Sequence, residues 1–130
     1  MSNGLTKTKT IVGIDYSLNS PAVCISTNGG TAFSDCYFYY LTSKKKHIGK
    51  MLENVIGYEH KEWKSPIERF SNLSGWVLHI LDTLHKKQTN KHVFIEGYSY
   101  GSKGQAIFQI AENGGILKYR LQKKFTCKTI

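Results

Sequence analysis

Two acidic residues each follow directly on a short apolar run, and this feature constrains the fold of the chain most strongly. Asp15 ends the run Ile11–Asp15, and Glu96 comes straight after Val93, Phe94 and Ile95. Runs rich in β-branched and aromatic residues predict buried strands. An isolated carboxylate on such a strand costs several kcal/mol unless it is paired or bound to a metal. If the two strands are neighbours, both acids face one spot at their carboxyl ends.

Three further segments are predicted as strands. Pro21–Thr27 and Thr31–Thr42 flank the turn signal Asn28-Gly29-Gly30, which indicates a hairpin. Together with residues 11–15 they form three sequential antiparallel strands. His92–Gly97 is the fourth strand, and Phe125–Ile130 begins a fifth.

Two segments are predicted as helices. Ser65, Pro66 and Glu68 form a capping box, and an apolar stripe at helical spacing follows as far as Lys87. The second helix runs from about Gln105 to Lys123. Its Gly114-Gly115 pair, which costs about 1 kcal/mol per glycine, indicates either close helix packing or a kink. Ser43–Lys64 is predicted as a long loop with one short helical turn around Met51–Ile56.

The order βββαβαβ predicts an α/β fold with a mixed five-stranded sheet flanked by helices. The chain has 130 residues, which suits a single domain over residues 1–130. No apolar run approaches the ~20 residues of a membrane span, and the polar segment Met1–Thr10 does not read as a signal peptide. We therefore expect no membrane partner and a cytoplasmic location.

The charge of the chain favours a polyanionic partner. Lys and Arg number 18 against 9 Asp and Glu, a formal net charge of +9. This excess in a small domain indicates nucleic acid. The cluster Lys44, Lys45 and Lys46 contacts phosphates or forms a solvated loop. Ser102 and Lys103, before the second helix, hold a phosphate or act as plain capping residues.

The cysteine and histidine patterns indicate neither a zinc site nor a disulfide. The chain has three cysteines without the spacing of a metal site and five scattered histidines. No nucleophilic Ser, Cys or His arrangement is present, and no small-molecule cofactor is expected. Two oxygen-bearing acids close together in a basic protein instead suit Mg²⁺ or Mn²⁺.

The residues around both acids carry a resemblance to a known family. The segments Ile11–Asp15 with Ser17–Ala22, Phe94–Tyr98, and Tyr98–Gly104 resemble the RuvC-type Holliday junction resolvases of the RNase H-like superfamily, above all the phage-borne members. The likeness covers the whole chain in element order. It implies an RNase H-like sheet and, for a phage protein, the cytoplasm of a bacterial host.

The resemblance also implies an activity. Asp15 and Glu96 would be the catalytic residues and would coordinate two Mg²⁺ or Mn²⁺ ions. The family members are homodimeric endonucleases of DNA recombination and repair that cut four-way junctions by metal-dependent hydrolysis. Tyr98 or Tyr100 would stack on DNA, and the helix after that loop would form the dimer contact.

One departure from the family pattern affects the metal site. The family adds one or two acids on a C-terminal helix, and here no Asp or Glu follows Glu112. We therefore expect a domain truncated before that acidic helix, with weak cleavage, and regard Asp82 and Glu112 as poorer substitutes. A non-catalytic branched-DNA-binding module is the main alternative. A fragment of an actin-like or sugar-kinase ATPase, which shares the Gly-Ile-Asp start, is another.

Overall fold

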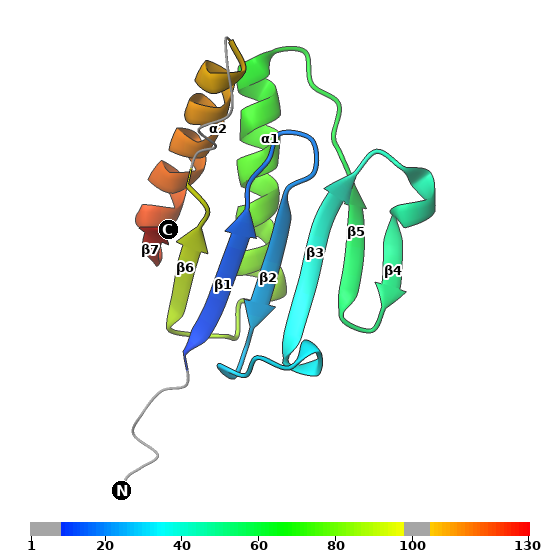
Figure 1. Cartoon of the computed structure of the whole chain (residues 1–130), viewed down its shortest axis with the longest axis vertical. Helices are drawn as coiled ribbons and strands as arrows, with labels where there is room; N and C mark the ends of the chain where they lie inside the picture. Colours follow the sequence, from blue (N-terminus) through cyan, green and yellow to red (C-terminus); the bar gives the residue numbers. More distant parts are fainter. Residues whose placement is uncertain (1–8, 98–104) are drawn as a thin grey trace, which may run out of the picture.

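The computed structural model describes residues 9–97 and 105–130, which form a mixed α/β structure (Figure 1). The strands are β1 (Thr10–Asp15), β2 (Ala22–Ser26), β3 (Cys36–Thr42), β4 (Gly49–Leu52), β5 (Val55–Glu59), β6 (Lys91–Ile95) and β7 (Thr126–Thr129). They form one seven-stranded sheet in the order β4-β5-β3-β2-β1-β6-β7. The helices are α1 (Pro66–His79) and α2 (Gln105–Gln122). The predicted α/β class with a mixed sheet is confirmed, with two more strands than expected.

The strand directions place several chain ends at one edge of the sheet. β2 is antiparallel to both β1 and β3, as predicted, whereas β6 is parallel to β1, β7 to β6, and β5 to β3. Consequently β5, β3, β1, β6 and β7 all run the same way and end at the same edge, which we call the carboxyl edge. Asp15, Thr42 and Glu59 lie there as the last residues of their strands, and Glu96 follows β6.

The hydrophobic core lies on one face of the sheet, beneath both helices. Along β1, Val12 and Ile14 are buried while Gly13 and Asp15 are exposed, so alternate residues point into the core. The core joins residues of β1, β2, β3 and β6 to α1 and to Leu117 and Leu121 of α2. Figure 1 shows both helices behind the sheet. The other face of the sheet carries no helix among the described residues.

The start of α1 is as predicted, and its end is not. Ser65 is the N-cap and its Oγ accepts a hydrogen bond from Glu68 N at 3.2 Å, with Pro66 at the first helical position. The predicted single helix through Lys87 is wrong, because the α-helix ends at His79 and Ile80–Leu84 form a π-helical turn. In that wider turn His85 N donates to Ile80 O at 3.0 Å.

The segment predicted as a long loop, Ser43–Lys64, instead contains β4, an edge strand of the sheet, and β5, which lies between β4 and β3. The helical turn expected around Met51–Ile56 is therefore wrong; a 3₁₀ turn lies earlier, at Lys45–His47. β4 is almost fully exposed and shows no burial alternation that a sequence pattern could reveal. Gly57 of β5 is buried, and a Cβ there would lie 2.7 Å from the Tyr40 ring and still closer to His47 O. Only glycine fits at this position.

The remaining predicted elements agree with the structure except at the start of the third strand. The kink considered at Gly114-Gly115 of the second helix is absent. The third strand begins at Cys36 rather than Thr31, because Phe33–Asp35 form a 3₁₀ turn held by the Asp35 carboxylate, which accepts from Ala32 N at 3.1 Å. α2 runs without a break through Gly114 and Gly115. Within the described ranges, no helix has the length and apolar character needed to cross a membrane.

Candidate metal and nucleic-acid site

The two acids singled out from the sequence lie on neighbouring strands at the carboxyl edge. Ile14 of β1 pairs with Ile95 of β6, and Glu96 N donates to Ile14 O at 3.2 Å. Since Ile14 and Ile95 point into the core, the next residue on each strand points to the opposite face. Neighbouring strands lie about 4.8 Å apart. The register therefore places the carboxylates of Asp15 and Glu96 side by side on the same face.

Asp15 and Glu96 both line two hollows: one of about 580 Å³ on the face of the sheet opposite to the two helices, and a pocket at the strand ends beside α2. The pocket beside α2 has a volume of about 530 Å³ and is lined by Asp15, Glu96, the loop 16–20 that follows β1, and one side of α2. The α2 residues are Ile110, Gly114 and Lys118, spaced four apart, so they share one helix face. The pocket thus joins the two acids to a lysine that sequence reasoning did not select. Its only sequence signal is its spacing from Ile110 and Gly114.

The electrostatics of this pocket favour a bound cation. Asp15 and Glu96 are exposed, and neither side chain has a hydrogen bond or ion pair within the part of the chain that the structure describes. Two adjacent unpaired carboxylates repel each other, and a divalent cation relieves that repulsion. Mg²⁺ is typically held by one or two carboxylates, waters and substrate phosphate oxygens, so this pair fits such an ion. No third His, Cys, Asp or Glu joins them within residues 9–97 and 105–130.

The two substitute ligands considered from the sequence do not reach this pocket. Asp82 pairs with Lys124 (Oδ2 to Nζ, 2.7 Å) and acts electrostatically on Lys91, the first residue of β6. Five strand residues, about 16 Å, separate that position from Glu96. Glu112 is exposed and lies two positions from Ile110 and Gly114, which turns it about 160–200° away from the pocket-lining face of α2. Both are therefore wrong as ligands of this site.

Tyr16, directly after Asp15, anchors the start of the loop in the interior. Its hydroxyl is buried and has no hydrogen-bond partner among the described residues. Burial raises the pKa of this phenol, and the positive charge of Arg120 lowers it to a smaller extent. Arg120 in turn donates from Nη1 to Ser74 Oγ at 2.6 Å, which joins α2 to α1. The loop that lines the pocket therefore starts from a fixed point between the two helices.

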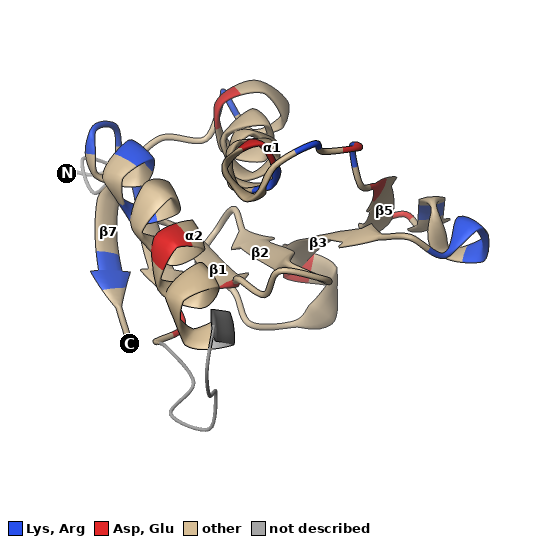
Figure 2. Ribbon diagram, turned by 90° about the horizontal axis from the view of Figure 1, so that it is seen from above, with Lys and Arg blue, Asp and Glu red and all other residues tan. Residues whose placement is uncertain are grey.

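The predicted DNA contacts are divided between described and undescribed segments. Tyr98, Tyr100, Ser102 and Lys103 lie outside the described residues. Lys44, Lys45 and Lys46 are exposed in the turn that follows β3. Figure 2 shows Lys and Arg positions beyond β5, on the side of the sheet away from β1. Lys44 lines a third hollow, of about 660 Å³, which also contains Asn19 and Ser20 of the pocket beside α2. The lysine cluster and the acids therefore border connected depressions.

The segment after β5 and α1 share a contact between two residues that the sequence did not single out. The guanidinium carbon of Arg69 lies 4.5 Å from the ring centroid of Trp63. Arg69 Nη2 also donates to Leu18 O at 3.0 Å and to Asn19 Oδ1 at 2.8 Å. Arg69 thereby ties α1 to the loop that lines the Asp15–Glu96 pocket. No sequence pattern marks this contact, because its partners lie some fifty positions apart.

Comparison of the chain with protein family models, with curated proteins and with solved structures found no match.

Proposed function

We propose that this chain is a metal-dependent endonuclease domain that acts on branched DNA. The observation that carries the proposal is the juxtaposition of Asp15 and Glu96 at the carboxyl ends of adjacent parallel strands, where neither side chain has a partner among the described residues and both line the same pocket. Ligands of open α/β sheets commonly bind at that end of the strands.

The element order gives independent support. Three antiparallel strands, then a helix, a parallel strand, a second helix and another parallel strand follow the βββαβαβ order that the resemblance to RuvC-type resolvases implies. The additional strands β4 and β5 lie at the β3 edge of the sheet, away from the two acids. An RNase H-like fold is thus part of the proposal.

In the proposed reaction, Asp15 and Glu96 hold Mg²⁺ or Mn²⁺ against a DNA phosphate. The metal would activate water and stabilise the leaving oxygen, as in other phosphodiester hydrolases. Two ions, as the resemblance implies, carry four positive charges against two carboxylates. Phosphate oxygens of the DNA would have to supply further ligands. Lys118 of α2 lines the same pocket and would orient the same phosphate.

The proposed substrate is a four-way junction or related branched DNA, and the proposed assembly is a homodimer. The net charge of +9 supports a nucleic-acid partner. The connected hollows at the carboxyl edge offer a track from the acids towards Lys44. The branched substrate and the dimer rest on the family resemblance.

The test is cleavage of a labelled four-way junction and of a linear duplex in Mg²⁺ or Mn²⁺. Asp15→Asn and Glu96→Gln should each lower junction cleavage at least about a hundredfold, since even the outer partners of metal ligands are worth 10–100-fold. Junction binding in a gel-shift assay should persist. Asp82→Asn is the matched control and should cut like the unchanged chain.

The other outcomes identify the alternatives. Steeply salt-dependent junction binding without cleavage at any metal concentration would indicate a binding module. Magnesium-dependent binding of ATP would indicate the ATPase fragment. Unchanged cleavage in Asp15→Asn would overturn the proposed mechanism.

A further inference from the structure

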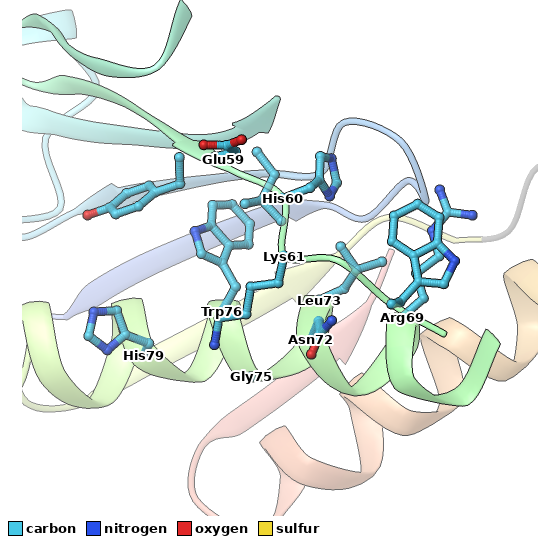
Figure 3. Close-up of a pocket in the computed structure, with 12 residues that line it drawn as sticks. Glu59, His60, Lys61, Arg69, Asn72, Leu73, Gly75, Trp76 and His79 are labelled. Atoms are coloured by element: carbon cyan, nitrogen blue, oxygen red, sulfur yellow. The ribbon is translucent and has the colours of Figure 1, made fainter. Parts of the chain in front are cut away.

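A pocket of about 320 Å³ lies between α1 and the segment after β5 (Figure 3). Its volume is at the lower end of the range of small-ligand pockets, about 300–1,000 Å³. Three aromatic rings line it, those of Tyr58, Trp63 and Trp76. Figure 3 shows Trp76 rising from α1 towards the segment that carries Glu59 and His60. The pocket is suited in size and lining to one flat, aromatic group.

The buried polar atoms of this pocket are hydrogen-bond donors. Trp76 Nε1 and Arg69 Nε are both buried, and neither has a partner within the described part of the chain. An indole N–H and a guanidinium N–H can only donate. A buried donor without a partner costs about 1–3 kcal/mol, so a small shift of the pocket wall that exposes either donor would favour an occupant with acceptor atoms. Nucleobases combine a flat ring with carbonyl and ring-nitrogen acceptors.

The entrance of the pocket is an aromatic platform. Trp63 is 45% exposed, and the Arg69 guanidinium stacks against its ring. An exposed tryptophan braced by an arginine is the arrangement on which proteins stack unpaired bases. The charged side chains around the platform are Glu59, Lys61 and the neighbouring His60 and His79, all on the pocket wall.

This pocket is continuous with the Asp15–Glu96 site. It shares Trp63, Arg69 and His60 with the Lys44 hollow, which shares Asn19 and Ser20 with the acidic pocket. Two residues of the aromatic pocket contact the loop 16–20. His60 Nε2 lies 2.7 Å from Asn19 O, and Arg69 donates to Leu18 O and Asn19 Oδ1. Asn19 lies four positions after Asp15, so their Cα atoms are at most about 14 Å apart, and Asn19 contacts Arg69 on the wall of the aromatic pocket.

We propose that the Trp63–Trp76 pocket receives an unpaired base of the DNA strand whose phosphate lies at Asp15 and Glu96. The inference rests on the proposed function and specifies its substrate: DNA with unpaired nucleotides close to the cleaved phosphate. Base binding fixes the 16–20 loop through Arg69 and His60. Fully paired duplex has no base to offer and binds through its phosphates alone.

The test uses tryptophan fluorescence. The chain has two tryptophans, so Trp76→Phe leaves Trp63 as the sole emitter. The probe is a gapped DNA, that is, a duplex with a stretch of about four unpaired nucleotides in one strand. It is compared with the same DNA without the bases of that stretch and with a continuous duplex. All three are measured without divalent cation. The base-bearing gap should quench Trp63 emission, and the other two DNAs should not.

Affinity provides a second measurement that does not depend on the Trp76 variant. Trp63→Ala should weaken binding of the gapped DNA by ~5–150-fold, the worth of one stacked base, and Trp63→Phe should restore most of it. Binding of continuous duplex should not change. Phe33→Ala is the matched control, because Phe33 is 57% exposed but lies before β3, at the edge of the sheet opposite to the pocket.

Each other outcome overturns the inference in a recognisable way. Equal affinity of Trp63→Ala and unchanged chain for gapped DNA would exclude base stacking, and the nuclease proposal would stand if Asp15→Asn still abolished cleavage. Quenching by adenosine monophosphate but not by gapped DNA would assign the pocket to a free nucleotide. Absence of binding to any DNA would refute both proposals together.

Discussion

The two ends of the strands, the one where β6 begins and the carboxyl edge where it ends, differ in whether their acidic side chains are paired. At the edge where β6 begins, Asp82 pairs with Lys124 at 2.7 Å and the buried His85 ring is bonded on both nitrogens. At the carboxyl edge, Asp15 and Glu96 lie next to each other with no side-chain partner in the described ranges. At the first edge, the Asp82, Lys124 and His85 side chains all have partners. The second edge leaves two like charges on neighbouring strands, which repel each other.

The His85 environment shows how complete the pairing is at the first edge. Gln88 Oε1 can only accept, so His85 Nδ1 donates to it at 3.1 Å, and Nε2 accepts from the Tyr39 hydroxyl at 2.6 Å. The neutral ring satisfies both bonds. Burial lowers the pKa of His85 and raises the pKa of Tyr39 to about 12. Both groups are therefore held in their uncharged forms, in contrast to the two open acids.

The largest expected effect comes from breaking this paired edge. His85→Ala should lower the free energy of unfolding by about 2–4 kcal/mol, because it leaves a cavity and an unpaired buried Tyr39 hydroxyl. Glu96→Gln, at the open edge, should not lower it. Urea denaturation of both variants makes the comparison, with His47→Ala as an exposed histidine control. A His85→Ala variant as stable as the unchanged chain would refute the contrast.

A divalent cation should strengthen the open edge alone. Mn²⁺ at ten times its dissociation constant should raise the free energy of unfolding by about 1.4 kcal/mol through preferential binding to the folded state. Asp15→Asn should abolish this gain, and Asp82→Asn should keep it. Thermal unfolding with increasing Mn²⁺ measures the effect. Equal stabilisation of all three chains would indicate binding elsewhere.

The sequence allowed the central part of the fold and the position of the acids to be predicted. The capping box at Ser65 and the apolar runs before Asp15 and Glu96 are local signals, and the structure agrees with the helix start and with strands at both runs. The sequence alone does not show whether the two strands are neighbours, and the parallel pairing of β1 with β6 meets that condition.

The parts that could not be predicted depend on long-range contacts or on exposed strands. β4 and β5 gave no burial alternation, and the π-helical turn at Ile80–Leu84 follows from packing rather than from propensity. The bonds from Arg69 to Leu18 and Asn19, and the position of Lys118 on the wall of the acidic pocket, exist only after α1 and α2 have packed on the sheet. The spacing of residues within one helix or strand does not predict such contacts.

A smaller, pH-dependent effect should come from the paired edge. Because burial lowers the pKa of His85 in the folded state, the unfolded chain binds the proton more tightly, and stability should fall as the pH drops below about 6.5. The groups facing this ring are the Tyr39 hydroxyl, the Gln88 amide, the Tyr37 ring and the Lys91 charge, which also lowers its pKa. His85→Gln, which cannot titrate there, should flatten this part of a stability–pH curve measured by denaturation. If the slope of this curve were unchanged in the variant, the pH dependence would come from other titrating groups.

The smallest expected effects test the sign of the difference between the two edges. Asp82 and Lys124 form a partly exposed ion pair, which is worth about 0.2–1 kcal/mol, so Asp82→Asn should destabilise the metal-free chain by no more than that. Asp15→Asn removes one of two adjacent like charges and should stabilise the metal-free chain by a similar amount. Raising the salt concentration should shrink both differences, since screening weakens attraction and repulsion alike. Denaturation of the two variants at low and high salt, without divalent cation, measures them. If Asp15→Asn destabilised the metal-free chain, its carboxylate would be a structural group, and the two edges would not differ in kind.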